Sequence, residues 1–413
     1  MQAPISIRFM TNAGADALPV YGELLSTDLP TQFPGIEVTV EPTPEGWQEK
    51  LVAQMAAGAA PDVFEAWGNI IYQWTGRNLV LDLQPLVDRD MSAEEIADFT
   101  AFQWEALEIL GIRAGMPRYV NMVTITVNVD KFEEYGVALP PEDGNWTWED
   151  YTEMARQLTS AARKSGNENQ WGGYIRPWSF DRFWMWVESF GGKVVNEKYG
   201  TQCLLDSDEA QAGLYWQYDM YWTENVFARR EQIESSNFMT ALTNNLICMA
   251  EDNTYPVLLD RRFDGRFRWD MRHIPVGPTG ERVALGTSDC WSIWSGTRNA
   301  DAAFNVVRYM TSSRFQLEGI AKAAGLIPAR RSAFTDFVAL ARSIQPRLEE
   351  VRIETIEEAF AWGYPKDTFW FKDQLAAAEI IRPALEAIYQ SGTQKPDLFI
   401  TLAKEITAAQ EAA

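Results

Sequence analysis

Residues 50–69, KLVAQMAAGAAPDVFEAWGN, contain an abrupt change of backbone pattern. Leu51 and Met55 lie four residues apart, and Trp47 comes one turn before them, which predicts one apolar face of a helix. Gly58 is a natural C-terminal stop for that helix, and Pro61 cannot continue it. The short apolar run after Pro61 therefore predicts a buried strand.

The predicted strand 62–67 ends at Trp67. Gly68 and Asn69 follow it, and both residue types favour turns. Ligands of open α/β sheets bind beyond the carboxyl ends of the strands. Trp67 and Asn69 are therefore candidate binding residues, with a place in the core as the alternative for Trp67.

The same alternation of strand and helix extends outward through the first 115 residues. Strands are predicted at 5–10 and 36–42, and a helix at 92–107 that starts with a capping box of Ser92 and Glu95. This order predicts a mainly parallel sheet. A second α/β region begins with the β run VTITVNV at 123–129, so two lobes joined by short crossings are expected, with the site in the cleft between them.

Composition and charge exclude several functions. The chain has 413 residues, of which 46% are hydrophobic, enough for two or three domains with large cores. The net charge of −22 disfavours nucleic acid, because such binding depends on Lys and Arg that release counterions. No apolar run approaches the length of about 18–20 residues that a membrane span requires.

Few residues are available for catalysis or for metal binding. Cys203, Cys248 and Cys290 are too scattered for a disulfide framework and are expected to be buried as small hydrophobes. His273 is the one histidine and is expected to be structural. No zinc site, phosphate-binding loop, catalytic residue or cofactor is predicted. The start, MQAPISIRFM, lacks a signal peptide, so the chain is either intracellular or a mature form with an added Met1.

Several segments, in order, resemble one family: the extracellular solute-binding proteins of ABC importers, in the sugar-binding group that includes maltose-binding protein. The segments are WQEKLVAQMAAGAAPDVFEAW, GMPRYVNMVTITVNVDKFEEYGVALPPEDGNWTWED, SFGGKVV, LDSDEAQAGL, MAEDNTYP, DAAFNVVRYMTSSRFQ and GLIPARRS. The resemblance covers nearly the whole chain, and the helix followed by Gly-x-x-Pro-Asp-Val is its most specific part. One departure is Val127-Asn128-Val129, where the family has Tyr-Asn-Lys.

The resemblance implies an α/β, two-lobe periplasmic-binding-protein type II fold with mixed, mostly parallel sheets and a hinge of short crossings. It implies an N-terminal lobe of residues 1–116 and 288–328, and a C-terminal lobe of 117–287 and 329–413 with a helical tail. The expected partners are a small carbohydrate and the membrane subunits of an ABC transporter, with the chain itself a monomer. The expected location is periplasmic, or extracellular and membrane-anchored, with the signal segment absent from this chain.

The resemblance also marks positions for the ligand. A pyranose offers apolar faces to aromatic rings and hydroxyl groups to carboxylates, amides and Arg. Trp178 lies where the family places a stacking aromatic in the second lobe, Asp181 follows one turn later, and Tyr255 matches another stacking position, whereas Trp184 and Trp186 are expected in the core. The remaining candidates are Asn12, Glu45, Tyr119, Asn121, Asp252, Asn253, Ser288, Asp289, Arg330, Trp362, Tyr364 and Trp370.

For some of these residues a structural role is the alternative. Asp252 and Asn253 also suit an ordinary Asx turn, Asp289 suits a turn, and Arg330 suits a salt bridge across the hinge. At least one of the three aromatics in AWGYPKDTFWF is expected to face the cleft, because exposed apolar patches usually mark binding sites.

The predicted function is capture of a carbohydrate, an oligosaccharide or a glycoside, by hinge closure in the inter-lobe cleft. One alternative with the same fold is a receptor for glycerol phosphate or a polyamine, for which Arg118, Arg176 and Arg330 are the loop cations available. A glycoside-processing enzyme is a further alternative; it would need two carboxylates roughly 5–10 Å apart, which Asp181, Asp252 or Asp289 could supply.

Overall fold

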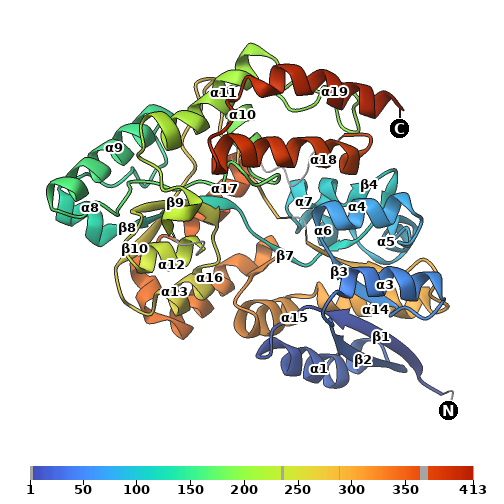
Figure 1. Ribbon diagram of the computed structural model, residues 1–413. Helices are drawn as coiled ribbons and strands as arrows, with labels where there is room; N and C mark the ends of the chain where they lie inside the picture. Colours follow the sequence, from blue (N-terminus) through green and yellow to red (C-terminus); the bar gives the residue numbers. More distant parts are fainter. Residues whose placement is uncertain (1–2, 234–236, 288, 363–370, 413) are drawn as a thin grey trace. The chain divides into compact units, whose positions relative to one another are not determined.

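The computed structural model describes residues 3–233, 237–287, 289–362 and 371–412. The chain divides into two compact units (Figure 1). The first unit comprises Met1–Asn121, Tyr255–Leu258 and Gly286–Pro346, and the second comprises Met122–Thr254, Leu259–Leu285 and Arg347–Ala413. The chain therefore passes several times from one unit to the other.

The first unit is built on a five-stranded sheet in the order β2-β1-β3-β11-β6. Its strands are β1 (Ile5–Thr11), β2 (Ile36–Pro42), β3 (Val63–Ala66), β6 (Met116–Pro117) and β11 (Cys290–Ile293). β1 pairs in parallel with β2 and β3, as the alternating sequence predicts, whereas β11 is antiparallel to both β3 and β6. The sheet is therefore mixed.

Two hydrophobic clusters form on the first unit because neighbouring strand residues face opposite ways. Ile7 and Phe9 of β1 pack into one cluster with α1 (Ala17–Thr27) and α14 (Ala300–Met310). Met10 packs into the other cluster with α3 (Trp47–Ala56) and α4 (Gly68–Gly76). Figure 1 shows these helices beside the blue strands.

Residues 50–66 fold as predicted, whereas Gly68 and Asn69, expected in a turn, begin α4 directly after β3. α3 buries Leu51 and Met55, and Gly58 has the left-handed φ of 71° that suits a glycine after a helix. β3 follows directly and is buried along its whole length. The remaining elements of the first unit are α2 (Leu29–Gln32), α5 (Gln84–Asp90), α6 (Ala93–Ala97), α7 (Ala101–Ala106), β4 (Glu108–Ile109), β5 (Ile112–Arg113), β7 (Tyr119–Val120), α15 (Ser313–Phe315), the π-helix η3 (Gln316–Ala323), β12 (Ile327–Pro328) and α16 (Phe334–Ile344).

The helix predicted at 92–107 is interrupted. Its capping box of Ser92 and Glu95 is present and starts α6, but the helix stops at Ala97 and α7 begins at Ala101. Asp98 accepts hydrogen bonds from the backbone of Arg331 at its carbonyl and from Ser332 at its carboxylate. These distant contacts hold the segment between α6 and α7 out of a helical path.

The second unit contains the antiparallel sheet β10-β8-β9, formed by β8 (Val123–Asn128), β9 (Met249–Asn253) and β10 (Trp269–Arg272). Among the described residues of this unit, parallel pairing takes the form of isolated bridges, such as those between Trp171 and Ile247 and between Gly173 and Phe227. The expectation of mostly parallel sheets therefore holds for β1–β3 and not for this unit, because β8 is bonded on both sides to strands that run the other way.

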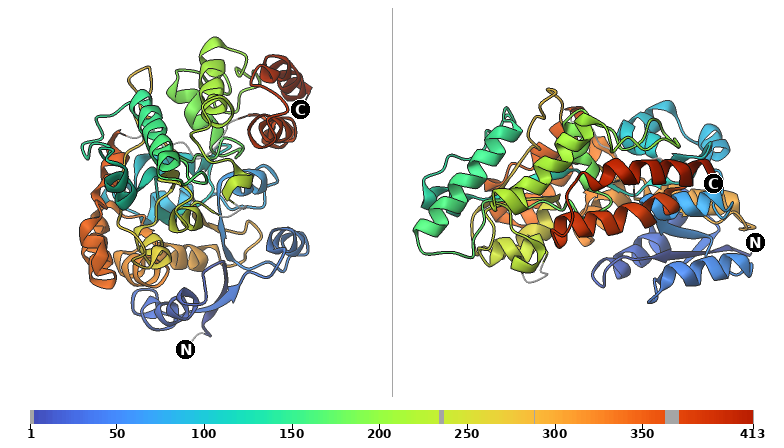
Figure 2. Two further views of the ribbon diagram at one scale, coloured as in Figure 1. Left: turned by 60° about the vertical axis from the view of Figure 1, so that its left-hand side comes forward. Right: turned by 45° about the horizontal axis from the view of Figure 1, so that its top comes forward.

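Helices surround the second sheet. α9 (Trp148–Lys164) starts with a capping box of Thr147 and Asp150, at the predicted position, and ends with Arg163 and Lys164 in its last turn. In the C-terminal part, α18 (Gln374–Leu385) and α19 (Leu398–Ala412) lie side by side (Figure 2). The other helices are α8 (Val129–Tyr135), α10 (Phe183–Ser189), α11 (Asp208–Tyr218), α12 (Phe238–Thr243) and α17 (Glu354–Trp362), and α13 (Pro256–Phe263) spans residues of both units.

The predicted lobe limits stay a prediction. The observed units group residues 329–346 with the first unit, because α16 packs against η3 and β12 there. Several smaller expectations are confirmed: Trp184 and Trp186 are buried, and the three cysteines are buried and form no disulfide within the described part of the chain.

Gly172 offers a test of the packing between α9 and the segment that follows it. A Cβ at Gly172 would lie 2.2 Å from the carbonyl oxygen of Ala155 and 2.5 Å from its Cα. Because backbone atoms cannot move aside, Gly172→Ala is expected to destabilise the protein by at least about 1–3 kcal/mol.

Gly22→Ala is the matched control, because Gly22 lies in α1 and its added Cβ would meet nothing within 4 Å. This change is expected to stabilise the protein by about 0.5–1 kcal/mol. Urea denaturation of both variants measures the difference, and equal stabilities would contradict the packing described.

Candidate functional site

A polar cluster lies in the first unit around Arg118, and we call it the Arg118 cluster: Thr11, Asn12, Glu65, Arg118, Tyr119, Tyr255 and Asp289. Arg118 is only 4% exposed. Its Nη1 lies 3.2 Å from Oε2 of Glu65 and donates a hydrogen bond of 3.1 Å to Oδ1 of Asn12. Glu65 is a charged residue inside the otherwise apolar strand β3, so this ion pair compensates two buried charges.

Glu65 is fully occupied by protein contacts. Oγ1 of Thr11 donates to its Oε1 at 2.5 Å, and the backbone N–H of Asn12 donates to its Oε2 at 2.9 Å. Glu65 therefore fixes Arg118 and the end of β1, and the side chain of Asn12 is held at the exposed edge of the cluster.

Tyr119, Asp289 and Tyr255 form the second half of this cluster. The hydroxyl of Tyr119 donates to Oδ2 of Asp289 at 2.7 Å and lies 3.4 Å from the hydroxyl of half-buried Tyr255. Burial raises the pKa of Asp289 to about 6, against the opposing effects of the Tyr119 hydrogen bond and the charge of Arg118. Oδ1 of Asp289 has no hydrogen-bond partner among the described residues, which leaves an acceptor for a ligand hydroxyl.

A second polar cluster lies in the second unit around Arg182, and we call it the Arg182 cluster: Arg176, Asp181, Arg182, Glu251 and Asp252. Glu251 and Asp252 belong to β9, and Arg182 immediately precedes α10. Nη2 of Arg176 donates to Oδ1 of Asp252 at 2.8 Å. Arg182 reaches three carboxylates, at 3.0 Å from Asp181, 3.3 Å from Glu251 and 3.6 Å from Asp252.

The members of the Arg182 cluster differ in exposure. Arg182 and Glu251 are almost completely buried, whereas the side chain of Asp181 is 53% exposed and that of Arg176 is 28% exposed. Burial raises the pKa of Glu251 to about 7, although the charges of Arg182 and Arg176 oppose the shift. Oδ2 of Asp252 has no partner within the described ranges, so this oxygen is also available to a ligand.

Trp178 lies beside the Arg182 cluster. The indole is half-buried and makes edge contacts with Tyr174 at 5.9 Å and with Tyr221 at 6.0 Å between ring centroids. The second unit thus places an aromatic ring and an open carboxylate oxygen within one short loop and one strand, the combination that suits a sugar ring.

The other predicted site residues are placed as follows. Trp67 is half-buried at the N-cap of α4, with its ring 5.3 Å from that of Trp47. Asn121 is buried, and its carbonyl accepts a hydrogen bond from the backbone of Thr287. Half-buried Asn253, the last residue of β9, donates its backbone N–H to Oδ1 of the neighbouring Asp252, while Glu45 is exposed. An Asx turn would need the N–H two residues after Asp252.

Several predicted residues cannot be assigned a contact. Ser288, Tyr364 and Trp370 lie outside the described residues. Asn69 is placed in α4 and Trp362 at the end of α17 by their backbones alone. Their roles stay predictions.

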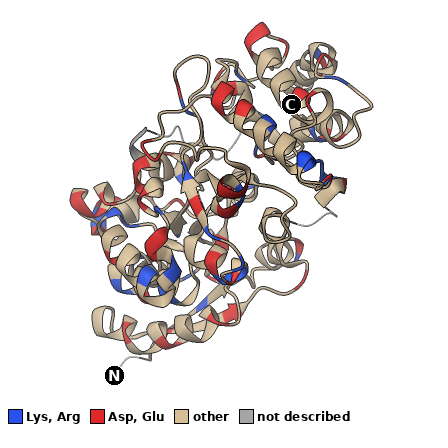
Figure 3. Ribbon diagram, turned by 90° about the vertical axis from the view of Figure 1, so that its left-hand side faces the viewer, with Lys and Arg blue, Asp and Glu red and all other residues tan. Residues whose placement is uncertain are grey.

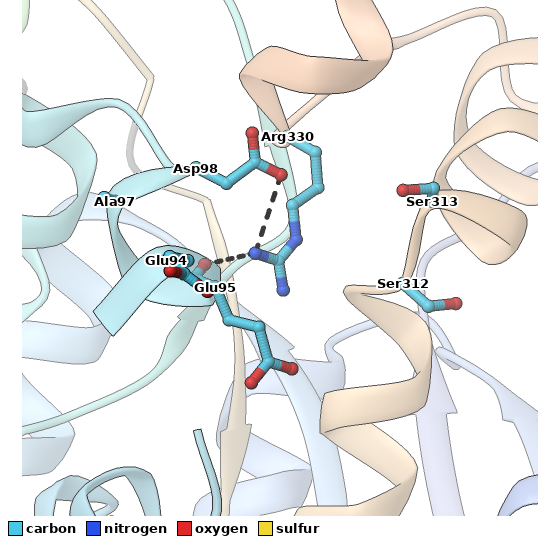
Figure 4. A pocket seen from close by; sticks show the side chains of 7 residues that line it. All are labelled: Glu94, Glu95, Ala97, Asp98, Ser312, Ser313 and Arg330. Atoms are coloured by element: carbon cyan, nitrogen blue, oxygen red, sulfur yellow. Dashed lines mark hydrogen bonds and ion pairs between the residues drawn. The ribbon is translucent and has the colours of Figure 1, made fainter. Parts of the chain in front are cut away.

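Arg330 belongs to neither cluster, and its contacts with described residues lie within the first unit. Its guanidinium donates to the carbonyl of Glu95 and pairs with Asp98 (Figure 4). It also lies 4.0 Å above the ring of Phe99 and donates to the carbonyl of Thr311. It therefore ties the end of α6 to the end of α14. The adjoining cavity of about 610 Å³ is lined by Glu94, Glu95, Ala97, Asp98, Ser312, Ser313 and Arg330 and contains no aromatic side chain.

Sequence reasoning missed Thr11, Glu65, Tyr174, Arg182, Tyr221 and Glu251, and named Arg118 and Arg176 only as possible phosphate ligands. A usable signal existed for two of them. Glu65 interrupts the short apolar strand β3, and Glu251 directly follows the apolar run LICMA. A carboxylate buried in such a place requires a cationic partner.

Two kinds of site are not found in the described parts of the chain. No group of three or more His, Cys, Asp and Glu side chains there is arranged to hold a metal ion. None of the helices there combines the length and the apolar character needed to span a bilayer.

The chain has two α/β units, and in each of them aromatic and charged side chains lie near strand ends. This arrangement is typical of a binding protein. The sequence profile of the bacterial extracellular solute-binding proteins matches residues 20–317. This match spans more than half of the chain, so the chain belongs to that family of binding proteins.

Solved structures of other binding proteins share the fold of this chain. An ABC substrate-binding protein from Listeria monocytogenes, in complex with cycloalternan, is 19% identical, with a TM-score of 0.80 and 99% of both chains covered. The sugar-binding protein MalE from Xanthomonas citri is 19% identical, with a TM-score of 0.76 over 98% of both chains. The cyclic alpha-maltosyl-1,6-maltose binding protein from Arthrobacter globiformis is 15% identical, with a TM-score of 0.76 over 99% of both chains. The expected two-lobe periplasmic-binding-protein fold is confirmed.

The ion pair of Arg118 and Glu65 predicts a large effect of a single substitution. Glu65→Ala would leave a buried guanidinium without its nearest counter-charge and is expected to destabilise the protein by about 3–5 kcal/mol. As a control, Glu153→Ala removes an exposed partner of Arg156, with which it pairs at 3.5 Å, and is expected to cost less than about 1 kcal/mol. Chemical denaturation compares the two, and similar losses would argue against the buried pair.

The chain's single histidine predicts a pH dependence of stability. His273 is 2% exposed and its Nε2 lies 2.8 Å from Glu358; burial lowers its pKa to about 4, although Glu358 opposes the shift. In the unfolded chain a histidine titrates near about 6.5. Between those values the unfolded chain binds more protons, so stability falls as the pH drops through that window.

Between about pH 7 and about pH 4.5, the free energy of unfolding of His273→Gln should fall by up to about 3 kcal/mol less than that of wild type. The free energies of unfolding of wild type and variant at both pH values give the difference. Parallel pH profiles would show that His273 is not held neutral in the folded protein.

Proposed function

We propose that this chain is the substrate-binding protein of an ABC importer and that it captures a carbohydrate. The Arg118 and Arg182 clusters each contribute one side of the binding site. The ligand contacts both only when the units close on it, so its affinity for the closed arrangement drives the closure. The membrane subunits of the importer recognise the closed form, and the protein acts as a monomer in the periplasm or anchored outside the cell.

The observation that carries the proposal is the pairing of half-exposed aromatic rings with open carboxylate oxygens. In the second unit, Trp178 comes two residues after Arg176, which pairs with Asp252. In the first unit, the hydroxyl of Tyr255 lies 3.4 Å from that of Tyr119, which donates to Asp289. The rings suit the apolar faces of pyranoses and the carboxylates suit their hydroxyl groups. Family membership and the sugar ligands named for the similar structures favour the same class of ligand.

The charge balance disfavours an anionic ligand such as glycerol phosphate. Arg118 is paired with Glu65, and Arg176 is paired with Asp252. Acidic residues also outnumber basic ones in the whole chain, and both signs are scattered along the ribbon (Figure 3). A phosphate group would therefore have to compete with carboxylates for every cation of the two clusters.

Isothermal titration calorimetry with a panel of mono- and oligosaccharides tests the proposal. At least one oligosaccharide is expected to bind tightly and to be recovered uncut after long incubation. Tight binding of glycerol phosphate or of a polyamine, with no response to any sugar, would overturn the proposal. Cleavage of the bound oligosaccharide would instead favour a glycoside-processing enzyme.

Trp178→Ala and Tyr255→Ala are each expected to weaken the affinity for the best oligosaccharide by about 1–3 kcal/mol, because each removes buried aromatic surface. This corresponds to about 5- to 150-fold in Kd. Tyr215→Ala is the control, because its neighbours Tyr218 and Asp397 belong to neither cluster. Unchanged affinity in both site variants would show that neither ring contacts the sugar.

A further inference from the structure

Arg182 has an unusual set of neighbours for a buried residue. Its side chain is 2% exposed, and its guanidinium contacts Asp181 at 3.0 Å, Glu251 at 3.3 Å and Asp252 at 3.6 Å. These carboxylates come from two separate parts of the chain, the loop before α10 and the strand β9. One cation therefore connects the loop that contains Trp178 to the strand that contains Asp252.

The ion pairs of Arg182 are poor candidates for a purely stabilising role. Removing charges from water costs several kcal/mol for each ion, so a buried ion pair often adds little net stability. Asp252 already has a closer cation, because Arg176 donates to it at 2.8 Å. What Arg182 adds is a fixed position for the carboxylates that surround it.

We propose that Arg182 is a positioning residue of the binding site, which holds Asp252 and Asp181 in place for the ligand by neutralising Glu251 between them. This inference rests on the function proposed above. Arg182 itself is covered by protein, so it acts through Asp252, whose Oδ2 remains open within the described part of the chain.

The surroundings of Glu251 explain why this neutralisation matters. Glu251 is fully buried and adjoins Arg182, Arg176 and Asp252, and the buried hydroxyl-bearing rings of Tyr151, Tyr174 and Tyr221 also interact with it. With both arginines present, two cations face three carboxylates. Without Arg182, one cation would face the same three carboxylates, and Asp252 would be repelled by Glu251.

The repulsion depends on pH, because Glu251 can avoid it by keeping a proton. Its pKa of about 7 would rise further without Arg182, since a favourable charge would be lost. In an Arg182→Gln variant, Glu251 is therefore neutral at low pH and Asp252 keeps its pairing with Arg176. At high pH Glu251 is charged, and Asp252 is displaced from its binding position.

The experiment measures Kd for the best oligosaccharide from the panel at about pH 6 and about pH 9. Arg182→Gln is expected to bind within about threefold of wild type at the lower pH and at least about tenfold more weakly at the higher pH. The double variant Arg182→Gln, Glu251→Gln is expected to recover most of that loss, because the repelling charge is gone. Arg182→Lys is expected to recover part of it, since it restores the charge without the fork of donors.

Arg156→Gln is the matched control, because it removes an arginine of the same unit whose partners Glu153 and Glu224 are exposed or half-exposed. It should bind like wild type at both pH values. A loss of equal size at both pH values in Arg182→Gln, not recovered in the double variant, would overturn the proposal and assign Arg182 a structural role.

A second measurement needs no ligand. The carboxyl carbon of Glu251, followed by NMR during a pH titration, should show a higher midpoint in Arg182→Gln than in wild type, with Arg182→Lys close to wild type. An unchanged midpoint in Arg182→Gln would also overturn the proposal. If wild type binds no sugar while this midpoint shifts, the proposed carbohydrate function fails and the electrostatic role of Arg182 stands.

Discussion

A guanidinium group that is removed from water needs acceptors and a counter-charge, and carboxylates supply both in the two clusters. Arg118 and Arg182 are 4% and 1% exposed, and each is held by acidic residues from other elements. The acids in turn belong to short buried strands, β3 and β9, which the sheets hold rigidly. Half-buried Asp289 and the largely buried Asp252 are thus supported by buried charges whose own positions are fixed.

Local order along the chain was predictable from the sequence, because caps and breakers act over a few residues. The capping boxes at Ser92 and Thr147 start helices as expected, and Gly58 precedes the turn into β3. The interruption between α6 and α7 was not predictable, because it is caused by contacts of Asp98 with residues more than two hundred positions away. The antiparallel pairing of β11 with β3 was not predictable either, because it joins residues that are equally far apart in the sequence.

In the candidate site, too, local features could be predicted from the sequence and long-range contacts could not. Trp178 and Tyr255 could be named from the sequence because their segments resemble a known family, and their contact with a ligand stays a prediction. The ion pairs were missed because they join residues far apart in sequence, 53 positions for Arg118 with Glu65 and 76 for Arg176 with Asp252. No local pattern contains that information, although a glutamate in an apolar strand indicates that some cation must be close.

The core of the second unit contains a group of indoles with a physical consequence of its own. The ring of Trp148 lies 3.9 Å from that of Trp186 and 4.2 Å from that of Trp216, at steep angles to both. Chromophores this close share their strong electronic transitions, so circular dichroism in the far-ultraviolet indole band should carry an exciton couplet from this trio. That optical signature would report the packing of one unit alone and would follow its melting separately from the rest of the chain.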